Sequence, residues 1–181
     1  MPDYERIYIT GFMGSGKSTV TPRLARCLDY KHLDLDAEIS KFLGMSIPAI
    51  FDVLGEDRFR ETESSILRDS RSLQQHVISL GGGSVTREEN LKFCLDNGLL
   101  VYLRASARFL SQRLSRSIRN RPMLFGADGT MLEGAELEER VEHLLSTRSG
   151  SYEQAHIVVH VDDKSPSEIT EAVCSAVRKQ Q

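Results

Sequence analysis

The sequence predicts an α/β protein built on a mostly parallel sheet. Along its 181 residues, segments with the pattern of strands alternate with segments that have the apolar periodicity of helices. A glycine-rich loop joins the first strand to the first helix, and a run of three glycines directly follows a later strand. No repeat, low-complexity tract or long linker interrupts the alternation. We therefore expect one domain over residues 1–181.

The first strand and helix flank the most informative motif of the chain. Residues 6–10 have the pattern of a strand, and residues 11–19, GFMGSGKST, fit G-x-x-x-x-G-K-[ST] and run into a helical pattern. Such a loop turns backbone N–H groups toward phosphate oxygens, and the helix N-terminus adds positive charge. We expect Lys17 to reach the β- and γ-phosphates and the Ser18 hydroxyl to coordinate Mg²⁺. The expected nucleotide contacts are Gly14, Ser15, Gly16, Lys17, Ser18 and Thr19. The alternative, a glycine-rich turn with a surface lysine, is disfavoured by the flanking strand and helix, so we expect a nucleoside triphosphate to bind.

Two carboxylates follow the second strand. Residues 30–33 have the strand pattern, Asp34 stands at the strand end, and Asp36 lies in the first turn of a helix that ends at Gly44. Open α/β sheets bind ligands at the carboxyl ends of their strands, beside the phosphate loop. Helix capping is the alternative for either aspartate. For the pair in this position we favour a role at the ligand.

The next helical segment contains a spaced ion pair. A short helical piece over residues 46–54 precedes a longer helix that opens at Gly55 and runs to about residue 73. Within it, Arg60 and Glu63 are spaced i, i+3, so the carboxylate can hold the guanidinium in one orientation. An ordinary solvated pair is the alternative.

The third strand, residues 76–80, leads directly into Gly81, Gly82 and Gly83. Three glycines at a strand end lower stability through chain entropy, so a close approach of the backbone to a ligand is the favoured explanation, with a plain loop as the alternative. A helix is expected over residues 84–97, followed by a buried central strand over residues 99–104.

A cationic segment follows the helix expected over residues 107–114. Residues 115–122, SRSIRNRP, carry three arginines and precede a turn cluster at residues 126–129. Such a loop can close over phosphates and neutralise developing charge, or it can be a solvated surface loop; the spacing alone does not separate the two.

The last third of the chain predicts a helix over residues 133–149, a strand over residues 156–161 and a final helix opened by a capping box at Ser165. Arg148 falls on the apolar stripe of the first of these helices, where a charge needs a partner unless it reaches solvent at the helix end. Pro22 is a local conflict inside the first helix, which it should bend unless it lies near the first turn.

Composition limits the other possibilities. A net charge of -3 and a pI near 6.0 argue against a nucleic-acid-binding surface. No apolar run approaches the roughly 20 residues that span a bilayer, and no secretory pattern opens the chain. Cys27, Cys94 and Cys174 are odd in number and lie in apolar periodic segments, so we expect buried, reduced thiols. We expect a cytoplasmic location because the sequence carries no contrary signal.

In sum, the sequence resembles the shikimate kinase family over essentially its whole length. The matching features are residues 11–19, residues 33–36, residues 55–63, Gly81 to Gly83, Arg121 with Pro122, and Arg148 followed by Tyr152. The resemblance implies ATP-dependent phosphorylation of the 3-hydroxyl of shikimate, on the route to chorismate and the aromatic amino acids. It implies a three-layer P-loop fold of the nucleoside-monophosphate-kinase type, with a five-stranded parallel sheet flanked by helices.

The resemblance also implies roles for individual residues. Asp36 would bind the substrate hydroxyls and help to deprotonate the attacking one, and Asp34 would act near Mg²⁺ together with Ser18. Arg60 and Arg148 would bind the carboxylate of shikimate, and the backbone of Gly81, Gly82 and Gly83 would line its ring. Arg121 would reach the ATP phosphates from a lid at about residues 115–129, and the substrate-binding segment would be residues 34–63. The catalytic set is Lys17, Asp36 and Arg121.

Some points stay open at this stage. Met123 stands where the family usually has a leucine, and which of Arg113, Arg116 and Arg119 stacks on adenine is undecided. A gluconate or nucleotide kinase of the same fold is the runner-up, since gluconate also carries a carboxylate. A nucleotide-switched regulator is disfavoured because the sequence has no N-K-x-D motif. We expect a monomer with small-molecule partners, ATP and shikimate, and neither nucleic acid nor membrane as a partner.

Overall fold

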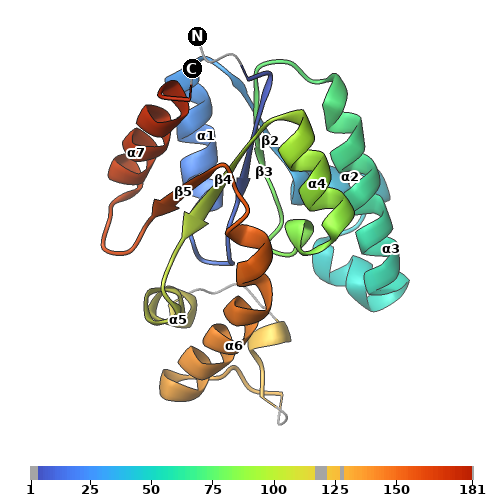
Figure 1. Cartoon of the computed structure of the whole chain (residues 1–181). Helices are drawn as coiled ribbons and strands as arrows, with labels where there is room; N and C mark the ends of the chain where they lie inside the picture. Colours follow the sequence, from blue (N-terminus) through green and yellow to red (C-terminus); the bar gives the residue numbers. More distant parts are fainter. Residues whose placement is uncertain (1–3, 117–121, 127–128, 181) are drawn as a thin grey trace.

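The computed structural model describes residues 4–116, 122–126 and 129–180. Five parallel strands form one sheet in the order β2-β3-β1-β4-β5, which confirms the predicted α/β fold (Figure 1). The strands are β1 (Arg6–Thr10), β2 (Lys31–Asp34), β3 (His76–Ser79), β4 (Leu99–Arg104) and β5 (Ile157–His160). Each expected strand is present, with its ends moved by at most one residue.

β1 lies at the centre of the sheet. Ile7 is in register with Val77 of β3 on one side and with Leu99 of β4 on the other. Helices cover both faces of this strand, so Tyr8 and Ile9 are buried as completely as Ile7. That double burial explains why the central strands are almost continuously apolar in sequence.

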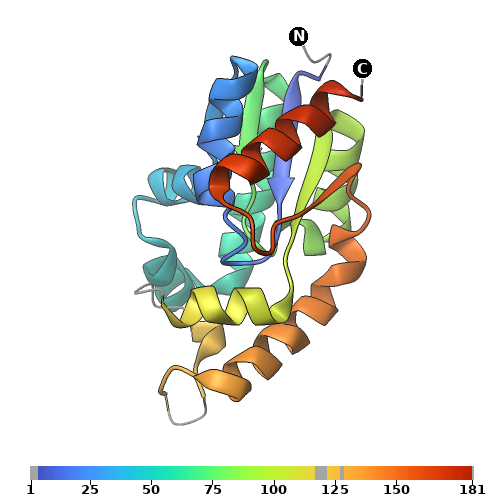
Figure 2. The ribbon, with the colours of Figure 1, turned by 90° about the vertical axis from the view of Figure 1, so that its left-hand side faces the viewer.

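Seven α-helices and three short 3₁₀ turns connect the strands in the part of the chain that the structure describes. The helices are α1 (Lys17–Leu28), α2 (Leu35–Leu43), α3 (Ile47–Asp69), α4 (Glu88–Asn97), α5 (Ala107–Ser115), α6 (Gly134–Tyr152) and α7 (Pro166–Arg178). The 3₁₀ turns are η1 (Ser70–Ser72), η2 (Ser84–Thr86) and η3 (Pro122–Leu124). Figures 1 and 2 show α1 beside α7 on one face of the sheet, α3 and α4 on the other, and α5 with α6 beyond one end of the strands.

A glycine divides α3 into the two helical pieces that the sequence predicts. Gly55 adopts φ 82° and ψ 169° inside the element, where the rest of the backbone is helical. A positive φ suits glycine because it has no Cβ. The Ser46 hydroxyl caps the first piece by accepting from the N–H of Ala49.

One predicted helix is wrong at its start. Residues 84–97 do not form a single helix, because η2 comes first and Arg87 is extended at φ −83° and ψ 124° before α4 begins at Glu88. The hydroxyl of Thr86 donates to the carbonyl of Gly83, and the N–H of Ser84 donates to the carbonyl of Gly81. These local bonds hold the segment after the glycines as a turn rather than as the first turn of a helix.

The cysteine expectation is also wrong in part. Cys94 is a buried free thiol, but Cys27 and Cys174 form a disulfide between the last turn of α1 and α7. Cys27 is exposed, so the prediction of a buried thiol from the apolar segment around it is wrong. Its partner lies 147 residues away, a distance at which sequence alone gives no pairing.

Two smaller observations complete the fold. Pro22 lies inside α1, half-buried, within a helix that starts at Lys17. Among the helices that the structure describes, none is long and apolar enough to cross a membrane.

Candidate active site

A cavity of about 1020 Å³ opens beside the carboxyl ends of β1, β2 and β3. This is the place where open α/β sheets bind ligands. The phosphate loop forms one wall of the cavity, Asp34 and Asp36 form another, and Gly81 and Gly82 form a third. Three segments that are far apart in sequence thus meet at one site.

The phosphate loop has the backbone that its glycines permit. Gly14 and Gly16 have φ angles of 85° and 102°, and Gly16 is the N-cap of α1. A Cβ at Gly11 would lie 2.8 Å from the carbonyl oxygen of Leu103, so a side chain there would collide with the neighbouring strand. Lys17 folds back over the loop, and its Nζ donates to the carbonyl of Gly11 at 2.5 Å. Its cation therefore lies over the cradle in which the sequence predicts phosphates.

The other predicted residues of the loop divide into two groups. Ser18 and Thr19 line the cavity together with Gly14 and Gly16. Ser15 is buried, and its N–H is already used in a hydrogen bond to the carbonyl of Phe12 at 3.1 Å. Ser15 thus shapes the loop from within.

Asp34 and Asp36 differ in their surroundings. Asp34 caps α2, since its Oδ1 accepts from the N–H of Ala37 at 3.1 Å, so the capping alternative is correct for this residue while it also lines the cavity. Asp36 lies in the first turn, as expected. Burial, with the negative charges of Asp34 and Glu63 adding to it, raises the pKa of Asp36 to about 6. A carboxyl with that pKa is a stronger base than an ordinary aspartate.

Arg60 and Glu63 form a buried ion pair, so the solvated alternative is wrong. Arg60 Nη1 donates to Glu63 Oε2 at 2.8 Å, and the Glu63 side chain is 0% exposed. Burial opposes the charge on the guanidinium, but the carboxylates of Glu63 and Glu56 together outweigh it and raise the pKa of Arg60. Arg60 also reaches the more exposed Glu56 at 3.3 Å.

The three glycines make room for charged side chains. A Cβ at Gly83 would lie 2.9 Å from Arg60 Nη2, and one at Gly81 would lie 3.0 Å from both Asp36 Oδ1 and Glu63 Oε1. A plain loop would not require such approaches. The acidic and basic groups of the site are therefore packed directly against this backbone.

Arg148 has a partner, as its position on the apolar stripe of α6 requires. Its guanidinium lies over the ring of Phe12, 5.4 Å from the centroid, and Nη1 donates to the carbonyl of Gly82 at 3.4 Å. One turn later, the hydroxyl of Tyr152 donates to the same carbonyl. The ring of Tyr152 stacks on Tyr102 of β4 at 4.9 Å between centroids.

Not every predicted residue lines the cavity. Among the described residues, Arg60, Gly83 and Arg148 do not line the cavity, although Arg60 packs against Gly83 and Arg148 donates to the carbonyl of Gly82, which does line it. Arg113 lines the cavity, whereas Arg116 does not. Arg119 and Arg121 lie outside the described residues.

The described residues among 122–131 contact each other and α6. An antiparallel bridge joins Phe125 to Met131, and Leu124 is buried. The Met123 sulfur lies 3.6 Å from Arg148 Nη2. Met123, which stands where the family usually has a leucine, thus contacts Arg148.

Eight residues of the cavity wall were not predicted individually as site residues, namely Met13, Ser40, Ser46, Ile47, Pro48, Ser79, Leu80 and Met123. Ser40 could have been found, because it lies one turn after Asp36 on the same face of α2. The expected substrate-binding segment, residues 34–63, includes the start of α3, but no single residue there was predicted, because these residues reach the cavity through the packing of α3 on α2.

Comparison with known proteins assigns the family. A family model described as shikimate kinase matches residues 13–178. The chain belongs to the shikimate kinase family. The shikimate kinase of Chlorobium limicola is 38% identical, over 99% of this chain and 92% of its own length, and that of Salinibacter ruber is 41% identical, over 87% and 77%.

Solved structures agree with this assignment. The shikimate kinase of Acinetobacter baumannii, in complex with shikimate, superposes with a TM-score of 0.86 at 30% identity and covers 99% of this chain and 96% of its own. A gluconokinase from Sinorhizobium meliloti has a TM-score of 0.61 at 18% identity, which shows a shared fold alone. The predicted P-loop fold of the nucleoside-monophosphate-kinase type is confirmed.

Proposed function

We propose that this protein transfers the γ-phosphoryl group of ATP to the 3-hydroxyl of shikimate, a step toward chorismate and the aromatic amino acids. Membership of the shikimate kinase family supports the reaction. The observation that carries the proposal is that Lys17 and Asp36 line one cavity, with Arg60 and Arg148 packed against the glycines at its edge. The donor and acceptor machinery therefore meets at a single site.

On the donor side, the phosphate loop binds ATP through its backbone, and Lys17 neutralises charge on the transferred phosphoryl group. The Ser18 hydroxyl and the Asp34 carboxylate are oxygen donors on the same cavity, which is the chemistry that Mg²⁺ prefers. When bound there, the ion would neutralise phosphate charge. Asp34 has a second carboxylate oxygen available for this role, since Oδ1 caps α2.

On the acceptor side, Asp36 accepts the proton of the attacking hydroxyl. A pKa of about 6 leaves it ionised at neutral pH yet basic enough to take the proton as the new bond forms. The planar guanidinium groups of Arg60 and Arg148 suit a carboxylate, and the backbone of Gly81 to Gly83 lies between them. Positioning and charge neutralisation supply most of the catalysis in such transfers.

Further parts of the proposal concern the organisation of the chain. Residues 1–181 form one domain, in which residues 34–63 bind the acceptor and residues 115–129 form a lid. Arg121 reaches the ATP phosphates from that lid. The protein works as a monomer in the cytoplasm, with neither nucleic acid nor membrane as a partner.

A coupled assay of ADP release tests the function. The protein is incubated with Mg²⁺-ATP and either shikimate, gluconate or a nucleoside monophosphate, and turnover is expected with shikimate alone. Lys17→Met should reduce that turnover to near background. Lys92→Met, on an exposed lysine paired with Asp96, is the control and should keep full activity. Turnover with gluconate but none with shikimate would refute the proposal.

A further inference from the structure

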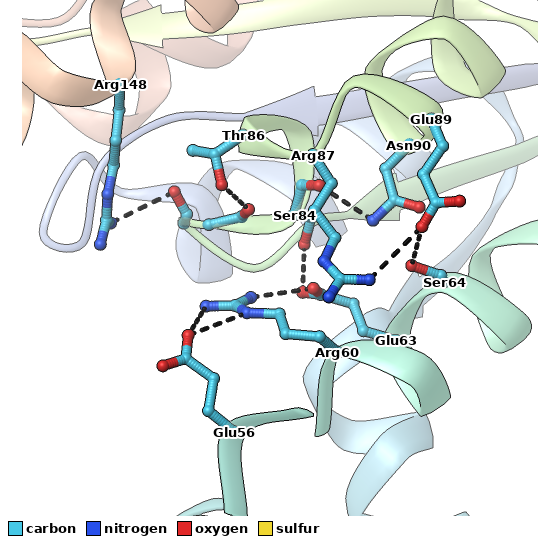
Figure 3. Close-up of polar contacts among 12 residues, drawn as sticks. Glu56, Arg60, Glu63, Ser64, Ser84, Thr86, Arg87, Glu89, Asn90 and Arg148 are labelled. Carbon is cyan, nitrogen blue, oxygen red and sulfur yellow. Dashed lines mark hydrogen bonds and ion pairs between the residues drawn. The ribbon is translucent and has the colours of Figure 1, made fainter. Parts of the chain in front are cut away.

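The Glu63 carboxylate is held from two sides by two different elements. Arg60 Nη1, one turn earlier on α3, donates to Oε2 at 2.8 Å. The Ser84 hydroxyl, at the start of η2, donates to Oε1 at 2.5 Å (Figure 3). Both Glu63 and Ser84 are 0% exposed. Because both oxygens are engaged in a buried place, the carboxylate has one orientation.

Ser84 is itself fixed by its neighbours. The side-chain amide of Asn90, on the first turn of α4, donates to the carbonyl of Ser84 at 3.0 Å. The N–H of Ser84 donates to the carbonyl of Gly81 at 3.2 Å. Asn90 is buried as well, so both bonds are shielded from water. The position of the Ser84 hydroxyl is thus set by the glycine turn and α4 together, independently of α3.

The orientation of Glu63 matters for Arg60. Among the described residues, the other ion pair of Arg60 is with Glu56, a side chain that is 66% exposed and whose Oε1 accepts from Nε and Nη2, both at 3.3 Å. Exposed pairs of this length fix a side chain weakly. Gly83 packs against the Arg60 guanidinium so closely that a Cβ at this position would lie 2.9 Å from Nη2. Glu63 is therefore the contact that determines which way the donors of Arg60 point.

We propose that Ser84 is a positioning residue of the acceptor site: its hydroxyl fixes the Glu63 carboxylate, which in turn orients Arg60 toward the substrate carboxylate. Ser84 acts through Glu63 and Arg60 without touching the substrate. Loss of its hydroxyl leaves a buried carboxylate oxygen without this donor and lets Glu63 and Arg60 take other orientations. The inference rests on the proposed function, because it assumes that Arg60 binds the carboxylate of shikimate.

The test compares Ser84→Ala with Ser64→Ala. Ser64 is also buried, but its hydroxyl donates to Glu89 and not to Glu63, so it is a matched loss of a serine hydroxyl from the same region (Figure 3). We expect Ser84→Ala to raise the Kd and KM for shikimate by roughly 5- to 10-fold, with kcat and the KM for ATP within about twofold. Ser64→Ala should leave all four constants near wild type. Calorimetric titration with shikimate gives the Kd independently of turnover.

A graded variant keeps the test decisive if Ser84→Ala folds poorly. Ser84→Cys retains a donor of similar size but weaker strength, so its Kd for shikimate should lie between those of wild type and Ser84→Ala. An unchanged Kd in Ser84→Ala or Ser84→Cys, with wild type active on shikimate, would overturn the positioning role and leave the proposed function intact. A wild-type protein that neither binds nor phosphorylates shikimate would overturn both.

Discussion

The hydroxyl of Tyr152 donates a hydrogen bond to the carbonyl oxygen of Gly82, 70 residues earlier in the chain. Arg148, one turn before Tyr152 on α6, donates to the same oxygen. The middle one of the three glycines after β3 is thus held by α6. A displacement of α6 would therefore move the wall of the cavity along with Arg148.

Tyr152→Phe tests this attachment. Loss of one buried hydrogen bond should lower the free energy of unfolding by about 1 kcal/mol, a fall in Tm of roughly 2–4 °C. Because Gly82 lines the cavity, the KM for shikimate should rise several-fold as well. Tyr30→Phe is the control, since it removes a tyrosine hydroxyl that donates to the carbonyl of Tyr4 at 2.9 Å, away from the cavity. If the two variants share the same KM, the bond to Gly82 is structural only.

Arg60→Lys separates the geometry of Arg60 from its charge. A lysine keeps a positive charge beside Glu63 but loses the planar fork that binds a carboxylate through two donors. We expect the KM for shikimate to rise about 10- to 100-fold while the KM for ATP changes less than twofold. Arg58→Lys, an exposed arginine two residues away, should behave as wild type. A change confined to the KM for ATP would assign Arg60 to the donor side.

Arg60→Ala is the less informative change for kinetics. It would leave the buried Glu63 carboxylate without its cation, which costs about 3–5 kcal/mol when one partner of a buried pair is removed. Thermal unfolding of this variant therefore measures the pair itself.

The pKa of Asp36 predicts how activity depends on pH. Only the ionised carboxylate can accept a proton, so kcat/KM for shikimate should be nearly constant above pH 7 and fall about tenfold per unit well below pH 6. The measurement is kcat/KM from pH 5 to pH 9 with ATP saturating. A decline that begins only near pH 4 would show that Asp36 is an ordinary carboxylate, or that another group limits the rate.

The raised pKa of Asp36 also predicts that Asp36→Asn increases the stability of the protein. The folded pKa lies above the unfolded value of 3.8, so the folded state binds more protons between about pH 4 and pH 6, and Asp36 lowers stability as pH rises through that window. At pH 8 the variant should be about 1–3 kcal/mol more stable than wild type, and the difference should vanish near pH 4. Urea denaturation at both pH values measures it. Asp52→Asn, at an exposed position, is the control and should show no such gain.

The disulfide predicts a redox dependence of stability. The bond joins cysteines that are 147 residues apart, and on the chain-entropy model such a cross-link stabilises the fold by up to about 5 kcal/mol. Reduction of the disulfide should therefore lower the Tm by several degrees or more. Thiol titration of the denatured, unreduced protein should find one free thiol, that of Cys94, and three after reduction. Three thiols before reduction would show that the bond does not form under those conditions.

The sequence was sufficient wherever local chemistry determines local structure. The phosphate loop and the break at Gly55 could be predicted because each depends on a few adjacent residues. The cap at Asp34 was considered only as the alternative to a role at the ligand. The spacing of Arg60 and Glu63 predicted their pairing, but their burial depends on η2 packing over α3, which only the folded chain reveals. Three other features also depend on packing between segments that are distant in sequence. They are the contact of Ser84 with Glu63, the position of Ile47 at the cavity and the pairing of Cys27 with Cys174.

The Cys27–Cys174 bond also turns most of the chain into a covalent ring. Every residue between the two cysteines, including Asp36, Arg60 and Arg148, lies within that ring, whereas Lys17 lies outside it. A protease that cuts the backbone once anywhere inside it would produce two fragments that stay attached to each other until the disulfide is reduced. On a non-reducing gel, a nicked molecule would therefore migrate as one species, and its loss of activity would report the local cut rather than separation of the pieces.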